Sequence, residues 1–201
     1  TVTGNYLILK DNKAEGGASF LAYNSVNNGN VSGWNIEEPG PEDYYWIGGS
    51  GNWSDLNHWS TSSGGDERHI ELPTSIDDVY FDDNSAFDSS EISIDLDVIF
   101  LNNLSTKGLS TGTTIGAKQG NDAKISIYGD LLLSSEPNYR FNEIAFIGDS
   151  IQNINIGGAY LGINSLLDFV GSATFEVTSG FKADRVNISN GMFISNGFTL
   201  E

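Results

Sequence analysis

Short runs of alternating apolar and polar residues recur along the chain. Examples are residues 92–98 (ISIDLDV), 125–128 (ISIY), 154–156 (INI), 175–177 (FEV) and 186–188 (VNI). A period of two places successive side chains on opposite faces of a strand, and helical periodicity is nearly absent. Gly-Asp, Asn-Gly and Gly-Gly pairs, which are turn signals, separate the runs. The pattern predicts an all-β protein.

The expected strands also follow a regular spacing. Beyond residue 91 we expect strands to start near residues 92, 98, 125, 131, 143, 151, 166, 174, 185, 192 and 198. Groups of two or three short strands therefore return about every 17–25 residues. Short strands joined by tight turns are typical of a right-handed parallel β-helix, a form of β-solenoid. An array of β-sandwich domains is the alternative, because a meander of hairpins gives a similar spacing.

A boundary is expected at residues 37–43 (EEPGPED), which hold two of the four prolines among acidic residues. This composition favours a short, semi-rigid joint. We expect residues 1–36 to be the C-terminal coil or coils of a preceding repeat unit. Residues 44–201 are then a Trp-rich start segment and the coils of the next unit, which continues beyond residue 201.

The net charge of −18 is distributed unevenly. Residues 37–97 hold sixteen of the 27 acidic residues and a single basic one, Arg68. Such a negative region disfavours nucleic acids and anionic membranes as partners. No stretch approaches 18 apolar residues, so we expect no membrane insertion. The absence of Cys excludes disulfides and thiol chemistry. The opening residues, without Met or a signal-like segment, indicate an internal fragment or a processed product.

Residues 44–60 (YYWIGGSGNWSDLNHWS) form a Trp-rich segment, and residues 72–82 (LPTSIDDVYFD) continue it. These segments resemble a repeat found in very large secreted proteins of Bacteroidota, the SprB-like gliding-motility adhesins, and residues 44–60 are the most specific part. Residues 10–18 (KDNKAEGGA) and 27–34 (NNGNVSGW) resemble the element that closes one repeat unit. Residues 190–200 (NGMFISNGFTL) are similar to other parts of the same repeat.

The resemblance implies a structural or adhesive repeat unit in a long filament on the cell surface, associated with the outer membrane. It implies export by the type IX secretion route and a role in gliding motility or surface attachment. The implied partners are neighbouring repeat units of the same chain, surface polysaccharides, and the gliding and secretion machinery.

The aromatic cluster Tyr45, Trp46, Trp53 and Trp59 is the first candidate site. Aromatic rings can stack on sugar rings, so a glycan-binding surface module is an alternative function. The competing interpretation is that the indoles cover one end of the coil stack and pack against its apolar residues.

A second candidate is a calcium site at Asp77, Asp78, Asp82 and Asp83, because Ca²⁺ takes six to eight oxygen ligands. Neither an EF-hand loop nor a Gly-Gly-x-Gly-x-Asp repeat is present. Apart from this candidate calcium ion, no cofactor is expected.

Catalytic residues are not expected. His58 and His69 lack a zinc-binding HExxH pattern, and no Gly-x-Ser-x-Gly elbow supports a Ser/His/Asp triad. A polysaccharide lyase or hydrolase is a weaker alternative. Beyond residue 97 the basic residues are scattered singly, whereas such enzymes gather charged groups on one face.

One modification site is a candidate. Ser150 lies in the tripeptide Asp149-Ser150-Ile151, which matches the short Asp-Ser/Thr-aliphatic pattern that Bacteroidota use for O-glycosylation.

Overall fold

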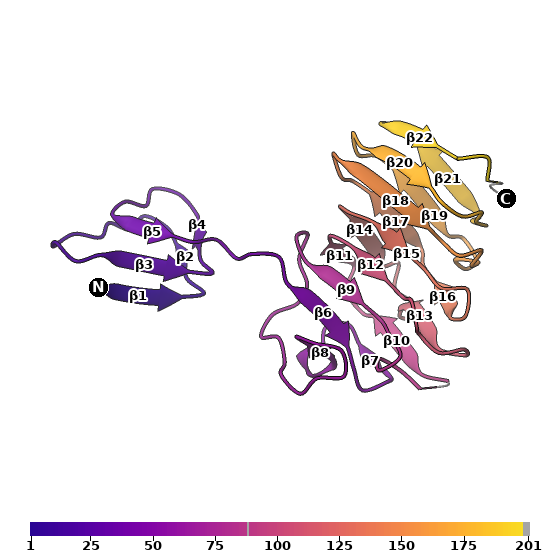
Figure 1. Cartoon of the computed structure of the whole chain (residues 1–201), viewed down its shortest axis with the longest axis horizontal. Helices are drawn as coiled ribbons and strands as arrows, with labels where there is room; N and C mark the ends of the chain where they lie inside the picture. The colour runs from indigo at the N-terminus through magenta and orange to yellow at the C-terminus, as the bar shows by residue number, and fades with distance from the viewer. Residues whose placement is uncertain (88, 199–201) are drawn as a thin grey trace. The chain divides into compact units, whose positions relative to one another are not determined.

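The computed structural model describes residues 1–87 and 89–198 (Figure 1). Contacts within the chain define two compact units, Thr1–Pro41 and Glu42–Glu201, here called the small unit and the large unit. The division falls inside the segment 37–43, where the sequence predicts a joint.

The small unit consists of two parallel sheets. One has the order β1 (Val2–Asn5), β3 (Phe20–Tyr23), β5 (Trp34–Ile36), and the other pairs β2 (Ile8–Leu9) with β4 (Val26–Asn27). Val2 pairs with Phe20 and Ile8 with Val26, both steps of 18 residues, whereas Phe20 pairs with Trp34 after 14. Side-chain hydrogen bonds between Asn5 and Asn24 and between Asp11 and Asn30 follow nearly the same spacing as the longer steps.

The large unit contains three sheets. The first sheet has the order β22 (Met192–Ile194), β20 (Thr174–Val177), β18 (Ile151–Asn155), β15 (Leu131–Leu132), β12 (Leu104–Ser105), β9 (Asp78–Tyr80), β6 (Asp43–Trp46), β8 (Trp59–Ser60). The second has the order β16 (Asn138–Arg140), β13 (Thr114–Ala117), β10 (Glu91–Ile94), β7 (Gly51–Asn52). The third has the order β11 (Val98–Leu101), β14 (Lys124–Ile127), β17 (Glu143–Phe146), β19 (Leu166–Phe169), β21 (Arg185–Ile188). A short 3₁₀ helix, η1 (Leu56–His58), precedes β8.

The chain visits the three sheets of the large unit in a fixed order. Strands β9, β10 and β11 belong to the first, second and third sheet, and the same order repeats in β12–β14 and in β15–β17. Between β18 and β19 the second sheet has no strand, and it ends at β16. The protein is therefore all-β with stacked parallel sheets, which is consistent with a β-solenoid-like fold (Figure 1).

Parallel pairing stacks similar side chains from one turn of the chain to the next. In the first sheet Val79, Leu104, Leu131, Ile154 and Val177 form one column, with steps of 25, 27, 23 and 23 residues. All five are buried. Each such side chain contributes roughly 1.5–3 kcal/mol when it is removed from water. The core is thus a continuous apolar interior between the sheets.

Strand positions agree closely with the alternation pattern. Of the eleven expected starts, ten lie within one residue of an observed strand start, from β10 at Glu91 to β22 at Met192. The expected strand near residue 198 extends into residues 199–201, outside the described residues. The pattern missed β12, β13 and β16. Among the described strand pairs only β6–β8 is antiparallel, unlike the antiparallel sheets of a β-sandwich.

None of the helices in residues 1–87 and 89–198 has the length and apolar character needed to cross a membrane.

Candidate functional site

The Trp-rich segment forms a buried aromatic cluster at the β6–β8 end of the large unit. Trp46, Trp53 and Trp59 are 0%, 2% and 0% exposed. Trp59 meets both other indoles edge-on, with ring centroids 5.0 Å from Trp46 and 4.7 Å from Trp53. Phe81, which follows β9, touches all three rings. The cluster therefore continues the apolar core beneath the first complete turn of the stack.

Two of the three indole N–H groups donate hydrogen bonds within this segment. Trp46 Nε1 donates to the carbonyl oxygen of Gly49 and Trp59 Nε1 to that of Trp53, both at 2.8 Å. The side chain of Asp55 caps η1 by accepting a hydrogen bond from the Asn57 backbone N–H. The Asn57 N–H and side-chain amide also lower the pKa of the Asp55 carboxyl. These bonds fold the segment into a compact loop that holds the indoles inward.

Both histidines are packed into the same end of the unit. The His58 ring stacks on Trp46 with centroids 4.6 Å apart, and its Nδ1 lies 2.7 Å from the carbonyl oxygen of Ile47. His69 stacks on Tyr44 at 3.6 Å and places Nε2 3.0 Å from the Asp43 carbonyl oxygen. Its Nδ1 lies 3.1 Å from the carboxylate of Glu42. Both imidazoles are therefore held by backbone carbonyls and aromatic rings.

This geometry bears on the expected glycan site. A ring that stacks on a sugar needs an exposed face, and Trp46, Trp53 and Trp59 present none. Tyr45 is half-buried and stacks on Tyr80, with centroids 5.0 Å apart. Burial and the nearby carboxylates of Asp43, Asp82 and Asp78 raise the pKa of Tyr45. The four residues lie together as the sequence suggested, but the three indoles occupy the core.

The carboxylates of Asp77 and Asp78 hold backbone and side chains in place. Buried Asp77 accepts hydrogen bonds from the Glu42 N–H (2.9 Å), the Thr74 N–H (2.8 Å) and the Thr74 hydroxyl (2.7 Å). Asp78 accepts from the side-chain amides of Asn102 and Asn103, both at 2.8 Å. These bonds join the loop before β9 to β6 and to the next turn of the stack.

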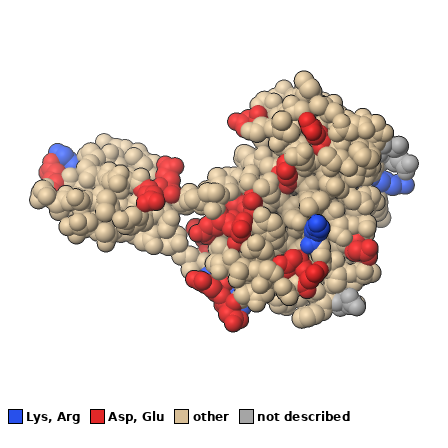
Figure 2. All heavy atoms as spheres, in the orientation of Figure 1, with Lys and Arg blue, Asp and Glu red and all other residues tan. Residues whose placement is uncertain are grey.

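Asp82 and Asp83 lie beyond β9. Asp82 accepts a hydrogen bond from the Asn84 N–H at 2.8 Å, while the Asp83 side chain is exposed. No group of three or more His, Cys, Asp or Glu side chains in the described ranges is placed to hold a metal ion. The structure therefore does not bring the four aspartates of the expected calcium site together as ligands. Figure 2 shows acidic side chains gathered near β6 and β9 on one face of the large unit.

Ser150 lies on the turn between β17 and β18. Its side chain is exposed and its hydroxyl donates to the carboxylate of Asp149 at 3.1 Å. The neighbouring Ile151 is 61% exposed. The hydroxyl is thus open to a modifying enzyme, and its glycosylation stays a prediction.

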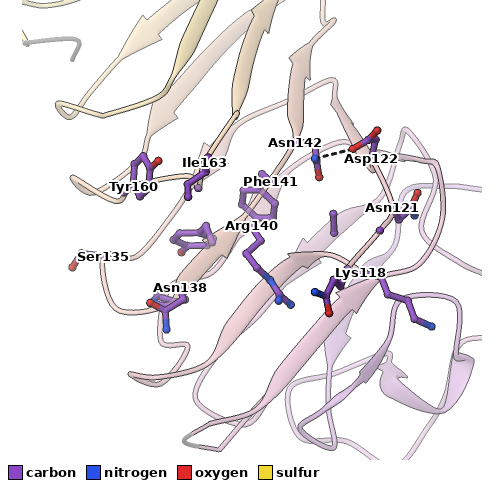
Figure 3. A pocket seen from close by; sticks show the side chains of 16 residues that line it. Lys118, Asn121, Asp122, Ser135, Asn138, Arg140, Phe141, Asn142, Tyr160 and Ile163 are labelled. Carbon is purple, nitrogen blue, oxygen red and sulfur yellow. Dashed lines mark hydrogen bonds between the residues drawn. The ribbon is translucent and has the colours of Figure 1, made fainter.

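Sequence reasoning missed an open cleft of about 700 Å³ beside the second sheet of the large unit (Figure 3). Three segments far apart in the sequence line it, residues 117–122, 135–142 and 160–163. No short motif marks these segments. The stretch between β18 and β19 lacks the strand that each of the three preceding turns contributes to the second sheet. This difference could point to the cleft, but it can be recognised only once the repeat length of the stack is known.

Comparison of the chain with protein-family models, with curated proteins and with solved structures finds no match. The relationship to gliding-motility adhesins therefore stays a prediction from the sequence segments described above.

Proposed function

We propose that this chain is a structural and adhesive repeat unit of a long bacterial cell-surface filament, and that it is not an enzyme. Its parallel strands would form the coils of a right-handed parallel β-helix, since parallel strands joined through a crossover are almost always right-handed. The type IX export route and the part in gliding motility or attachment rest on the resemblance of residues 44–60 and 72–82 to the adhesin repeats.

The observation that carries the proposal is the continuous column of buried aliphatic residues from Val79 to Val177. Each turn of the chain covers its neighbour, so the fold can be lengthened without a new core. Aromatic packing around Trp59 covers one end of the column. Polar side chains such as Asp77, Asp78 and His69 support loops and strands, which favours a structural role over a catalytic one.

The last described turn of the large unit offers an apolar surface. Val186 and Ile188 in β21 are 40% and 48% exposed, whereas their partners in β19, Leu167 and Phe169, are buried. A further coil laid on β21 would bury them. A filament of successive units provides such a coil, and this arrangement agrees with the neighbouring repeats that the sequence resemblance implies.

Immunogold electron microscopy of intact cells that produce the chain tests this proposal. An antibody raised against residues 42–198 should label unpermeabilised cells, with gold particles in lines that extend from the cell surface. A serum from unimmunised animals is the control. Labelling that appears only after the cells are broken would contradict the surface-filament role.

A further inference from the structure

The cleft beside the second sheet exists because one turn of the chain omits a strand there. Strand β16 is the last strand of the second sheet, and the loop between β18 and β19 passes beyond it. This loop is attached to β16's end by a hydrogen bond of 3.0 Å from the Phe141 N–H to the carbonyl oxygen of Leu161. Leu161 is buried and anchors the loop in the core. The loop is therefore fixed to the end of the second sheet at this point.

Two apolar side chains face solvent at the loop wall of the cleft (Figure 3). Ile163 is 78% exposed and Tyr160 is 43% exposed. The Tyr160 hydroxyl donates to the carboxylate of Asp184 at 3.4 Å, which leaves the ring to line the cleft. Ile163 does not belong to the buried core of the large unit. These two side chains supply an apolar contact surface next to polar groups.

The lining of the cleft is also rich in primary amides. The amide residues that line it are Gln119, Asn121, Asn138 and Asn142. Asn142 donates to the Asp122 carboxylate at 3.2 Å, and Asn121 donates to the carbonyl oxygen of Leu96 at 3.2 Å. Each amide offers both donors and an acceptor. These bonds orient two of the amides and leave further hydrogen-bonding capacity for a ligand.

The charges of the cleft are balanced. The guanidinium of Arg140 is paired with the carboxylate of Glu91, and Lys118 lies in the same lining as Asp122. The whole chain carries a net charge of −18, which repels polyanions at long range. The electrostatics therefore favour a neutral ligand over an acidic one.

We propose that this cleft binds a neutral oligosaccharide. Sugar hydroxyls donate and accept hydrogen bonds, so they match primary amides, while the C–H faces of the rings match Tyr160 and Ile163. A volume of about 700 Å³ lies in the range of small-molecule sites and accommodates a few sugar rings. The proposal does not rest on the filament role, and it places saccharide recognition away from the Trp cluster.

The test measures binding of the whole chain to a panel of neutral hexasaccharides of glucose, mannose, galactose and xylose by isothermal titration calorimetry. A hexamer of galacturonate serves as the anionic comparison. At least one neutral hexasaccharide should bind, and more tightly than the galacturonate. Binding to none of them, or a preference for galacturonate, would overturn the proposal.

Variants locate the binding site. Tyr160→Ala and Ile163→Ser should each weaken binding about tenfold or more, which corresponds to about 1.4 kcal/mol. The matched controls are Tyr128→Ala and Ile151→Ser, which change exposed residues of the same types outside the cleft. Melting temperatures identify any variant that is misfolded, and Ile163 is too exposed for its replacement to unfold the chain. If binding were lost in the control variants but kept in the cleft variants, the assignment of the binding site to the cleft would be overturned. Surface labelling of cells, which tests the filament role, would be unaffected by that result.

Discussion

At the scale of the residue, the indole of Trp59 illustrates how single side chains hold the β6–β8 end of the large unit. It contacts Tyr44, Trp46, Trp53 and Phe81 and has no exposed surface. Removing a buried ring of this size costs the transfer free energy of the ring and leaves a cavity. The aromatic cluster therefore stabilises the unit through packing.

Trp59→Ala should lower the free energy of unfolding by about 3–5 kcal/mol. Urea denaturation followed by far-UV circular dichroism measures the change. Phe87→Ala is the control, because Phe87 is 77% exposed and its loss should cost less than about 0.5 kcal/mol. A Trp59→Ala variant with unchanged stability would mean that the ring is not part of the core.

Asp77→Ala should lower the free energy of unfolding by about 3 kcal/mol. The change leaves the N–H groups of Glu42 and Thr74 without their acceptor, and an unsatisfied buried donor costs roughly 1–3 kcal/mol. Urea denaturation with and without EDTA measures the effect. Asp83→Ala, at an exposed position, should be nearly neutral. An Asp77→Ala effect that disappears in EDTA would instead indicate a metal ligand.

The buried phenol of Tyr139 predicts a dependence of stability on alkaline pH. Burial raises the pKa of Tyr139 to about 12, although hydrogen bonds to Thr106 and Ser134 act in the opposite direction. Because the folded pKa lies above the unfolded value near 10, the stabilisation is fully present below pH 10 and is lost as the pH rises through 12.

The free energy of unfolding should therefore fall between pH 10 and 12, by about 2–3 kcal/mol on account of this residue. Tyr139→Phe should reduce that slope without abolishing it, because the pKa of Tyr80 is also raised to about 12 by burial and by Asp78. Chemical denaturation at several pH values measures the slope. Tyr128→Phe, at a partly exposed tyrosine, is the control. An unchanged slope in Tyr139→Phe would contradict the prediction.

At the scale of the element, the turns are shaped by the close approach of consecutive turns of the chain. Gly157 and Gly158 follow β18, and both have positive φ, +61° and +76°. A Cβ on Gly157 would lie 2.7 Å from the carbonyl oxygen of Leu133, whereas a Cβ on Gly158 would meet nothing within 4 Å. Only the first position therefore limits the distance between adjacent turns.

Gly157→Ala should destabilise the protein more than Gly158→Ala. Both variants place a side chain on left-handed backbone, which costs roughly 1–2 kcal/mol. Gly157→Ala should cost about 1–3 kcal/mol more, because it forces neighbouring backbone apart. Urea midpoints of the two variants give the difference directly. Equal midpoints would show that the turns do not approach each other as closely as described.

The sequence predicts correctly the strands that alternate clearly, such as Ile125-Ser126-Ile127 in β14, and those that are purely aliphatic, such as Leu131-Leu132 in β15. The missed strands have neither feature. Strand β12 has only two residues, β16 is Asn-Tyr-Arg with one buried side chain, and β13 contains Gly116. Their strand conformation depends on pairing with neighbouring turns. The sequence of one short segment does not show which other segments pair with it.

At the scale of the whole molecule, the turns are shorter toward the C-terminal end of the large unit. Steps in the first sheet are 25 and 27 residues from Val79 to Leu131, while Thr174 pairs with Met192 after 18. The second sheet has no strand after β16, and the cleft lies beside this end of the sheet. The cleft could not be predicted from the sequence, because it depends on which loops meet across turns.

The central claim is that successive turns of the large unit stack in parallel and in register. In the third sheet Lys124, Glu143 and Leu166 occupy one outward column, as register partners in β14, β17 and β19. Adjacent strands lie about 4.8 Å apart, so thiols at neighbouring positions of this column can be bridged, while those two strands apart are separated by about 10 Å. The chain has no native Cys, so introduced pairs react alone.

Cross-linking of double-cysteine variants with a short thiol-bridging reagent, followed by mass spectrometry, tests this claim most directly. The pairs Lys124→Cys with Glu143→Cys and Glu143→Cys with Leu166→Cys should each give an intramolecular bridge in high yield. Lys124→Cys with Leu166→Cys should give little. A bridge in the third variant as efficient as in the first two, or none in any of them, would contradict the parallel stack.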